Sequence, residues 1–451
     1  MEAILAAPHD RMPFWRKLAI GSGDIGLNLY WQSSSLFLLF FYTDILGISA
    51  AAAGTIYMAA LIWDAAIDPV VGAIADRTKT RWGRYRPYLL FGAPPLALSY
   101  VLVYALPSLG AAWIVALTTA AHFLFRTFYA VVAIPYASMF ARVTRDAGER
   151  ATMAGIRMTC ALLAALAVSA GTLPMAKLLG GGIEGWSLLA IIYGVFACFF
   201  LWLTALAASD GDRGDEAAVP ERLTLRRSFA TMIENRPLLL VLGIILILSF
   251  TSTFFSKNIL YFFKYARGDE EFGGTALAIL AAIAAISAPA WAVLARRTSK
   301  RTALLVGLAL DLVGYASWYA LASESYGILI AALACSALGR SAIFVCFWSM
   351  LPDTVEYGEW KSGVRTESLI FGFVIFAQKA ALGIAAGGLG LALGVIGFVP
   401  NAAQSADTLW WLVFLMAAVP ASGSLAALGL TLAYPLDPAM HRRIIAEIES
   451  K

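Results

Sequence analysis

The chain has 451 residues, of which 60% are apolar and only 14% are charged, and its mean hydropathy is +0.76. Soluble domains are typically about 45–50% apolar and about 25% charged, so this composition excludes a soluble globular protein and predicts an integral membrane protein. The net charge of +4 is too small to indicate a nucleic-acid partner. All four cysteines fall in apolar segments, which argues against a metal cluster or a disulfide framework.

Apolar runs along the chain are long enough to cross a membrane, since a transmembrane helix needs roughly 20 mostly apolar residues. The tail before the first run shows no small-residue cleavage site, so we expect a cytoplasmic tail that leads into an uncleaved first span. Twelve spans are expected, at 18–42, 50–74, 88–107, 111–136, 151–173, 186–208, 237–264, 274–294, 303–322, 326–351, 369–398 and 408–434.

Basic residues gather in alternate loops, and Lys and Arg near helix ends stay on the cytoplasmic side of a membrane. The N-terminal tail and the loops after spans two, four, six, eight and ten are rich in Lys and Arg, whereas the other loops offer little beyond Lys177 and Arg267. Because the number of spans is even, both termini are expected in the cytoplasm.

The longest polar stretch, residues 209–236, lies between the sixth and seventh spans. This position predicts an N-terminal six-helix bundle at 1–208, a cytoplasmic linker at 209–236 and a C-terminal six-helix bundle at 237–451. The expected fold is therefore an all-α membrane protein with 12 transmembrane helices in two bundles. The remaining loops are too short to form a soluble catalytic domain.

Two acids stand four residues apart in the second span, so Asp64 and Asp68 share one helix face. Two carboxylates this close cannot both be ionised cheaply in a low dielectric. We interpret them as a site for a coupling proton or cation, with Na⁺ as the possible metal ion. The alternative is a structural ion pair, with Arg157 of the fifth span as the expected partner, and the two roles do not exclude each other.

Other polar residues at membrane depth usually face the bundle interior. In the first span, Asp24, Asn28 and Trp31 follow one helical stripe, which predicts the wall of a polar cavity lined with aromatic rings. Arg157 and Lys379, together with Lys257, can hydrogen-bond the hydroxyl groups or a carboxylate of a solute. Their alternative role is charge compensation for the acids. Arg126 and His122 lie in the fourth span, and a lone histidine there is more often structural than a ligand.

The basic block after the second span begins with Gly72-x-x-x-Asp76-Arg77, which resembles the loop motif of the major facilitator superfamily. Asp76, Arg77 and Arg84 are expected to contribute to a cytoplasmic gate. The same spacing can also arise from the positive-inside bias alone.

A second charged segment, residues 353–368, is expected to be a loop between spans ten and eleven. Its acids Asp353, Glu356 and Glu359 can meet the basic blocks that follow spans two and four, which would complete an inner gate. A solvated loop without such a role is the alternative.

Several motifs in this order together resemble the glycoside–pentoside–hexuronide:cation symporter family, the family of the melibiose carrier. They are Tyr42-Thr-Asp44, Trp63-Asp-Ala-Ala-Ile-Asp-Pro69, Arg81-Trp-Gly-Arg-Tyr-Arg-Pro-Tyr88, Ile134-Pro-Tyr136 and Asp353-Thr-Val-Glu-Tyr-Gly-Glu-Trp-Lys361. The resemblance implies a major facilitator fold and cofactor-free uptake of sugars by alternating access, driven by Na⁺, Li⁺ or H⁺. It also implies that Asp64 and Asp68 form the cation site, that Arg157 binds sugar and that Lys379 serves both sites.

The sequence departs from the melibiose-carrier pattern at several implied site positions. Asn28, Ala133 and Ala137 replace the residues that hold a galactoside there, so galactoside specificity is not transferred. Ile67 and Ala130 replace oxygen donors of the Na⁺ site. A proton needs only one carboxylate, so H⁺ is favoured over Na⁺. The excess of bases over acids at membrane depth suggests an anionic solute, but a neutral glycoside remains open.

We therefore expect a monomeric sugar symporter in the plasma (inner) membrane and not an enzyme. Its expected substrate-binding residues are Asp24, Asn28, Trp31, Arg157, Phe344 and Lys379. One alternative is a carrier of lysolipids or other amphiphiles with the same fold. Another is an intramembrane enzyme acting on lipids, which would need a nucleophile or metal cluster that the sequence pattern does not suggest.

Overall fold

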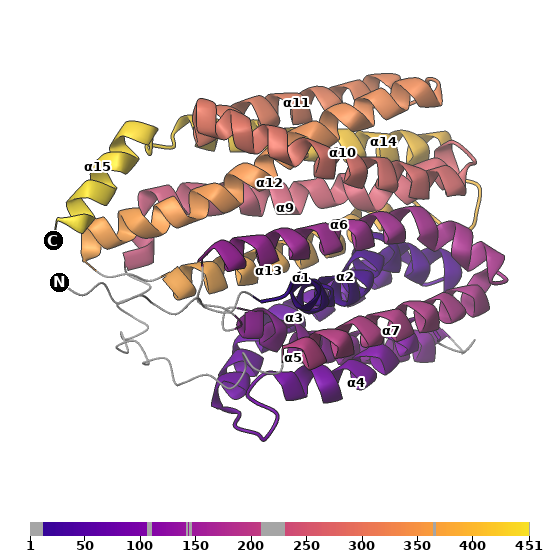
Figure 1. Ribbon diagram of the computed structural model, residues 1–451. Helices are drawn as coiled ribbons and strands as arrows, with labels where there is room; N and C mark the ends of the chain where they lie inside the picture. Colours follow the sequence, from indigo (N-terminus) through magenta and orange to yellow (C-terminus); the bar gives the residue numbers. More distant parts are fainter. Residues whose placement is uncertain are drawn as a thin grey trace. The chain divides into compact units, whose positions relative to one another are not determined.

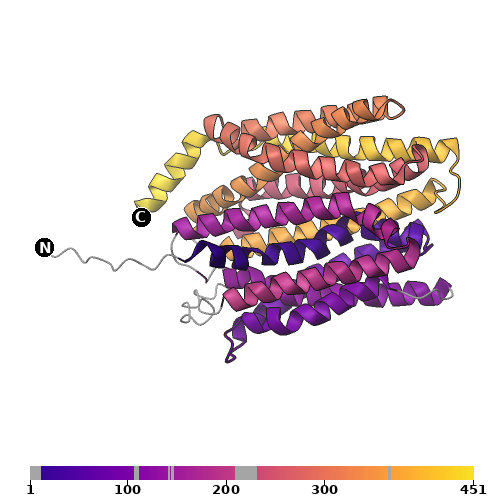
Figure 2. The same ribbon diagram turned by 45° about the vertical axis from the view of Figure 1, so that its right-hand side comes forward.

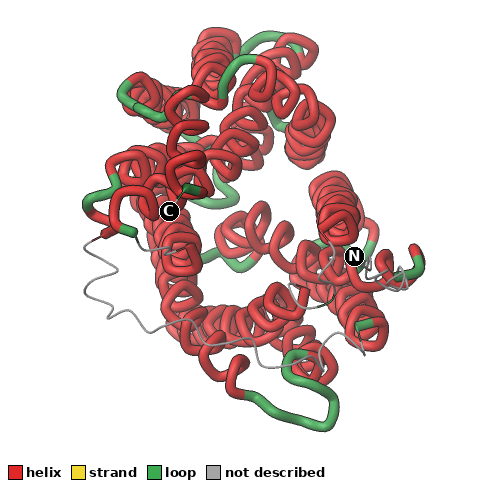
Figure 3. The backbone as a smooth tube through the Cα atoms, turned by 60° about the vertical axis from the view of Figure 1, so that its left-hand side comes forward, coloured by secondary structure: helices red, strands yellow, loops and turns green. Residues whose placement is uncertain are grey.

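The computed structural model describes residues 12–105, 111–140, 143, 147–208, 231–363 and 367–450, and these residues form helices and turns with no strand (Figure 3). Most of the predicted linker, 209–230, and the end of the third predicted span, 106–107, lie outside the described residues. The helices are α1 (Phe14–Gly21), α2 (Gly23–Phe40), η1 (Phe41–Ile45), α3 (Ala50–Arg77), α4 (Arg86–Tyr104), α5 (Ala111–Phe140), α6 (Ala147–Leu178), α7 (Gly182–Ala207), α9 (Arg236–Tyr261), η3 (Phe262–Ala266), α10 (Glu270–Arg297), α11 (Lys300–Leu321), α12 (Tyr326–Ser362), α13 (Glu367–Val395), α14 (Ala406–Leu432) and α15 (Pro438–Glu449).

In the described part of the chain, 11 helical segments are long and apolar enough to cross a membrane. They are α3 to α7, α9 with η3, and α10 to α14. Large apolar side chains such as Phe91 and Leu98 on α4 and Phe196 on α7 are more than half exposed, as expected of surfaces that face lipid. The chain is therefore a multi-pass integral membrane protein.

The first predicted span, 18–42, is not one helix but α1 followed by α2 and the π-helical turn η1. The break falls at Ser22, which lies between Gly21 and Gly23. Glycine is a weak helix former, and the Ser22 hydroxyl donates a hydrogen bond of 2.8 Å to the carbonyl of Ala19. These local preferences explain why an apolar run of the expected length forms two helices.

The chain divides by its contacts into two compact units, Met1–Ser35 with Ala66–Ala217 and Leu36–Ala65 with Ala218–Lys451. In the first unit, α4 lies beside α5 and α7 (Figure 2). In the second, α11 packs against α12 and α14, and α9 packs against α13 and α14. The predicted limits of the two six-helix bundles remain a prediction.

The predicted loop at 353–368 is wrong for most of its length, because α12 continues to Ser362 (Figure 1). At 1.5 Å per residue, its 37 residues span roughly 55 Å, which exceeds the roughly 30 Å of a hydrocarbon core. The charged part of α12 therefore extends beyond the membrane as helix. The unpredicted helix α15 packs on it, and the Trp360 indole donates a hydrogen bond of 2.6 Å to Glu447.

Small residues let α3 approach α13 closely in the second unit. A Cβ atom added to Gly54 would lie 2.8 Å from the carbonyl oxygen of Ala386 and 2.8 Å from the Cα of Gly390. Helices in membranes commonly use glycine at such crossings because side chains would hold the backbones apart. Further along the same pair of helices, this approach brings Asp64 of α3 to Lys379 of α13.

We expect Gly54→Ala to lower the free energy of unfolding of the detergent-purified protein by about 1–3 kcal/mol, and with it the melting temperature, because the added methyl group meets backbone atoms. Gly372→Ala on α13 is the matched control, since a Cβ there meets no atom within 4 Å. Equal melting temperatures for the two variants would contradict the close crossing.

Candidate functional site

The second unit buries an ion pair between α3 and α13. The Asp64 side chain is 0% exposed, and its Oδ2 lies 3.0 Å from Nζ of Lys379, whose side chain is 14% exposed. Both carboxylate oxygens are buried, and neither accepts a hydrogen bond from the described residues, so the contact with Lys379 is an ion pair alone. Asp64 therefore has charge compensation from one lysine, and both of its oxygens can still accept a hydrogen bond from a further donor.

A second buried cation lies on α9 of the same unit. Nζ of Lys257 is 3.9 Å from the centre of the Tyr57 ring, which is the geometry of a cation–π contact. Tyr57 precedes Asp64 by two turns on α3. The first half of α3 thus contacts lysines from both α9 and α13.

Asp68 lies one turn beyond Asp64 on α3 and is partly buried. It belongs to the first unit by its contacts, whereas Asp64 belongs to the second. The shared helix face of the two acids is retained because α3 is continuous from Ala50 to Arg77. Their joint role as a cation site remains a prediction.

In the first unit, Asp24 accepts hydrogen bonds from several donors. The Arg157 guanidinium binds both carboxylate oxygens, through Nε to Oδ2 and through Nη2 to Oδ1 at 3.3 Å. The Tyr136 hydroxyl donates to Oδ2 at 2.6 Å, and the guanidinium also lies 4.9 Å from the centre of the Tyr136 ring. The partner of Arg157 is therefore Asp24, and the structural ion pair expected between Arg157 and the acids of α3 is replaced by this one.

The other predicted binding residues of α2 follow the same stripe as Asp24. Asn28 and Trp31 are partly exposed, and the amide of Asn28 donates to the carbonyl of Asp24 at 2.9 Å. The Trp31 ring lies 6.0 Å from that of Tyr129 on α5. Phe344 on α12 is 51% exposed, and its ring lies 6.3 Å from that of Trp348.

The predicted gate residues fall into two local groups. At the end of α3, Asp76 accepts a hydrogen bond of 2.7 Å from Tyr85, Arg77 is exposed and Arg84 is partly buried. On the charged part of α12, Asp353 and Glu356 contact Lys300 and His441, and Glu359 is partly buried. Whether either group acts as a gate remains a prediction.

Asp353, Glu356 and His441 also have the residue types of a metal site, and their ligand atoms lie within 4.8 Å of one another. However, Nζ of Lys300 lies 2.7 and 2.8 Å from the two oxygens of Asp353 and already supplies the positive charge. Burial, and then the nearby Asp353 carboxylate, raises the pKa of Tyr434 well above its usual range, so Tyr434 remains neutral there. This cluster is better explained as an ion-pair network than as a metal centre.

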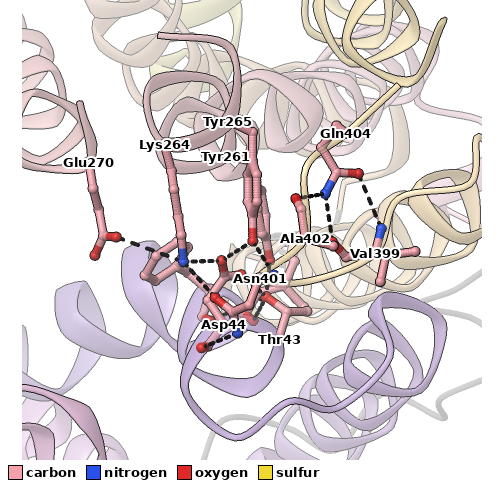
Figure 4. Close-up of polar contacts among 12 residues, drawn as sticks. Thr43, Asp44, Tyr261, Lys264, Tyr265, Glu270, Val399, Asn401, Ala402 and Gln404 are labelled. Atoms are coloured by element: carbon pink, nitrogen blue, oxygen red, sulfur yellow. Dashed lines mark hydrogen bonds and ion pairs between the residues drawn. The ribbon is translucent and has the colours of Figure 1, made fainter. Parts of the chain in front are cut away.

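A further network, missed by the sequence analysis, joins η1, η3 and the turn before α14 (Figure 4). Asp44, with its side chain 0% exposed, accepts from Lys264 at 2.6 Å and from the Tyr265 hydroxyl at 2.5 Å. Asn401 donates to the backbone carbonyl of Asp44 at 2.7 Å and accepts from Lys264 at 3.0 Å. This carboxylate is saturated with donors, unlike that of Asp64.

Two signals in the sequence could have indicated this network. Asp44 is part of the Tyr42-Thr-Asp44 motif, and Lys264 is a base at the very end of a predicted span. Asn401 is the one non-glycine residue with positive φ in the described chain, at 57°, a conformation that asparagine tolerates better than most residues. Their meeting depends on tertiary structure that spacing alone does not give.

Comparison with known proteins decides the family. The family model described as "MFS/sugar transport protein" matches residues 19–438. The chain belongs to this family. The match confirms the resemblance to the glycoside–pentoside–hexuronide type of symporter and the major facilitator fold, and it places the chain among transporters and not among enzymes.

Relatives and solved structures agree with this family. The isoprimeverose transporter of Lactiplantibacillus pentosus is 31% identical and aligns over 98% of this chain and 93% of its own length. The glucuronide carrier protein homolog of Escherichia coli (strain K12) is 28% identical over 97% of this chain and 96% of its own. A crystal structure of a D-xylose-proton symporter has the same fold, with a TM-score of 0.66 at 12% identity over 93% of this chain and 97% of its own.

We expect Lys379→Gln to destabilise the protein by about 3–5 kcal/mol, because it leaves the buried Asp64 carboxylate without its cation. The double variant Asp64→Asn/Lys379→Gln removes both charges and should recover most of that loss. Thermal unfolding of Lys379→Gln, of the single variant Asp64→Asn and of the double variant measures the coupling between the two charges. Additive effects of the single substitutions would show that the two charges do not stabilise each other.

Proposed function

We propose that the protein is a cation-coupled symporter that carries a sugar, glycoside or uronide across the membrane by alternating access, with H⁺ rather than Na⁺ as the coupling ion. The family supports a sugar substrate, and relatives named for isoprimeverose and glucuronide support sugars and glycosides in particular. The observation that carries the proposal is the buried Asp64–Lys379 ion pair, in which neither carboxylate oxygen accepts a hydrogen bond from the described residues.

Coupling follows from competition for Asp64. A proton on Asp64 removes the negative charge that attracts Lys379, and the released ammonium group can donate hydrogen bonds to sugar hydroxyls. When the proton leaves, the carboxylate attracts Lys379 again and the sugar loses those bonds. Proton and sugar therefore favour each other's binding, and this reciprocity is what a symporter requires.

The choice of H⁺ over Na⁺ rests on the number of oxygen donors available. Asp64 and Asp68 can supply carboxylate oxygens, but Ile67 and Ala130 occupy the positions to which the family resemblance assigns further donors. Hard cations are bound by several oxygens at once, whereas a proton needs one carboxylate.

The substrate side of the proposal uses the polar stripe of α2. Asp24, held by Arg157, and Asn28 offer acceptors and donors for sugar hydroxyls, and Trp31 offers an aromatic face. We include Lys379 as the residue shared with the coupling site. Phe344 is retained as an exposed aromatic candidate on α12.

The two charged groups at the ends of α3 and α12 are proposed as parts of a cytoplasmic gate. They comprise Asp76, Arg77, Arg84, Asp353, Glu356 and Glu359. The bias of basic residues to alternate loops supports cytoplasmic termini, and we propose that a monomer works in the inner membrane. The match to a sugar-transport family gives no support to a lysolipid carrier.

In proteoliposomes, we expect labelled glycosides or uronides to accumulate when the lumen is alkaline, and not under a Na⁺ gradient alone at equal pH. Asp68→Asn should abolish this uphill accumulation while sparing part of the exchange of substrate across the membrane. A panel of labelled neutral and acidic sugars gives the substrate in the same assay.

Asp407→Asn is the control, since Asp407 is an exposed acid in the first turn of α14. It should accumulate substrate as the wild type does. Full concentrative uptake by Asp68→Asn, or accumulation driven by Na⁺ alone, would overturn the proposed coupling.

A further inference from the structure

The antiparallel helices α2 and α5 meet along a polar seam in the first unit. At one end, the Tyr136 hydroxyl binds Asp24, and further along, the ring of Tyr129 lies beside that of Trp31. Successive contacts involve higher residue numbers on α2 and lower residue numbers on α5, as expected of antiparallel helices. At the far end of the seam they reach Arg126, whose guanidinium lies 5.4 Å from the centre of the Trp31 ring.

Arg126 is buried without a carboxylate. Arg126 is only 1% exposed. Among the described residues, no acid forms an ion pair with it. Nε donates to Nε2 of His122 at 3.2 Å, Nη2 reaches the Ser34 hydroxyl at 3.5 Å, and Nη1 has no hydrogen-bond partner among the described residues. One amino group of this buried guanidinium therefore lacks an acceptor among the described residues.

A buried cation without an anion is unfavourable, because the protein interior replaces little of the hydration that the charge has lost. The rings of Trp31 and Phe125, each 5.4 Å from the guanidinium, attract it but carry no net charge. At membrane depth such an uncompensated charge marks a functional position more often than a structural one.

Arg157, the other arginine of the seam, differs from Arg126 because a carboxylate compensates its charge. It binds both oxygens of Asp24. Asp24 and Ser34 are ten residues apart on α2, which is about 15 Å of helix. The two guanidinium groups thus lie at separate ends of the seam, with the partly exposed Asn28 and Trp31 between them.

We propose that Arg126 is an anion subsite that receives the carboxylate or sulfonate group of an acidic sugar. A planar guanidinium suits an oxyanion because it donates in a fixed fork. His122 accepts from Nε and so orients the fork, leaving Nη1 for the ligand. This inference rests on the proposed sugar-transport function and extends it to the substrate's charge.

Substrate binding to the purified, full-length protein tests the subsite with three probes: methyl β-D-glucuronide, the matched methyl 6-deoxy-6-sulfoglucoside and neutral methyl β-D-glucoside. The wild type should bind at least one acid more tightly than the neutral sugar. Arg126→Gln should weaken binding of that acid about 10- to 100-fold, the usual worth of a hydrogen bond to a charged group. It should change binding of the neutral sugar less than about threefold.

Arg126→Lys keeps the charge but loses the fork, so its affinity for the acid should fall between those of the wild type and Arg126→Gln. Arg86→Gln is the matched control, because Arg86 is also a buried arginine of this unit, with Nε donating to the carbonyl of Ala205 at 2.7 Å. It should leave the preference for the acid unchanged.

The subsite is overturned if the wild type binds the neutral sugar as tightly as both acids, a result that needs no variant and leaves sugar transport intact. It is also overturned if Arg126→Gln keeps the wild-type preference for an acid. If no sugar, acidic or neutral, binds or is transported, the proposed function itself fails and the subsite with it. A response to only one of the two acids identifies the carboxylate or the sulfonate as its ligand.

Discussion

A buried carboxylate in a membrane protein must be neutralised by the protein, a proton or a bound cation. Asp64 meets this requirement only in part, through Lys379 at 3.0 Å on one oxygen. The pair exists because Gly54 and Gly390 let α3 and α13 approach closely. Glycines distant from the charges therefore determine how close Asp64 and Lys379 lie. A proton that neutralises Asp64 also weakens its attraction for Lys379.

The buried charges of the chain differ in how completely they are compensated. The carboxylates of Asp24 and Asp44 each have several donors, which hold them in fixed positions. Among the described residues, Asp64 has one cation and no hydrogen-bond donor, and Arg126 has no anion. The incompletely compensated groups gain most from a proton or a charged ligand, because binding there improves the local balance of charge.

Hydropathy alone predicted most of the spans and the intramembrane acids, because both depend on local composition. It did not predict that Ser22 interrupts the first span, or that α12 continues as helix through the charged residues after Asp353. The ion-pair partners of the charged residues were even less predictable from the sequence. Arg157 was expected to pair with the acids of α3 and instead binds Asp24, since the choice depends on which helices pack together and not on spacing along one helix.

The central claim is that substrate binding and protonation of Asp64 are linked. Proton uptake by the purified protein in weakly buffered, Na⁺-free solution measures this link directly when substrate is added. We predict that the wild type takes up close to one proton per bound sugar and that Asp64→Asn takes up none. Sugar binding by the wild type with no proton uptake over the same pH range would contradict the account.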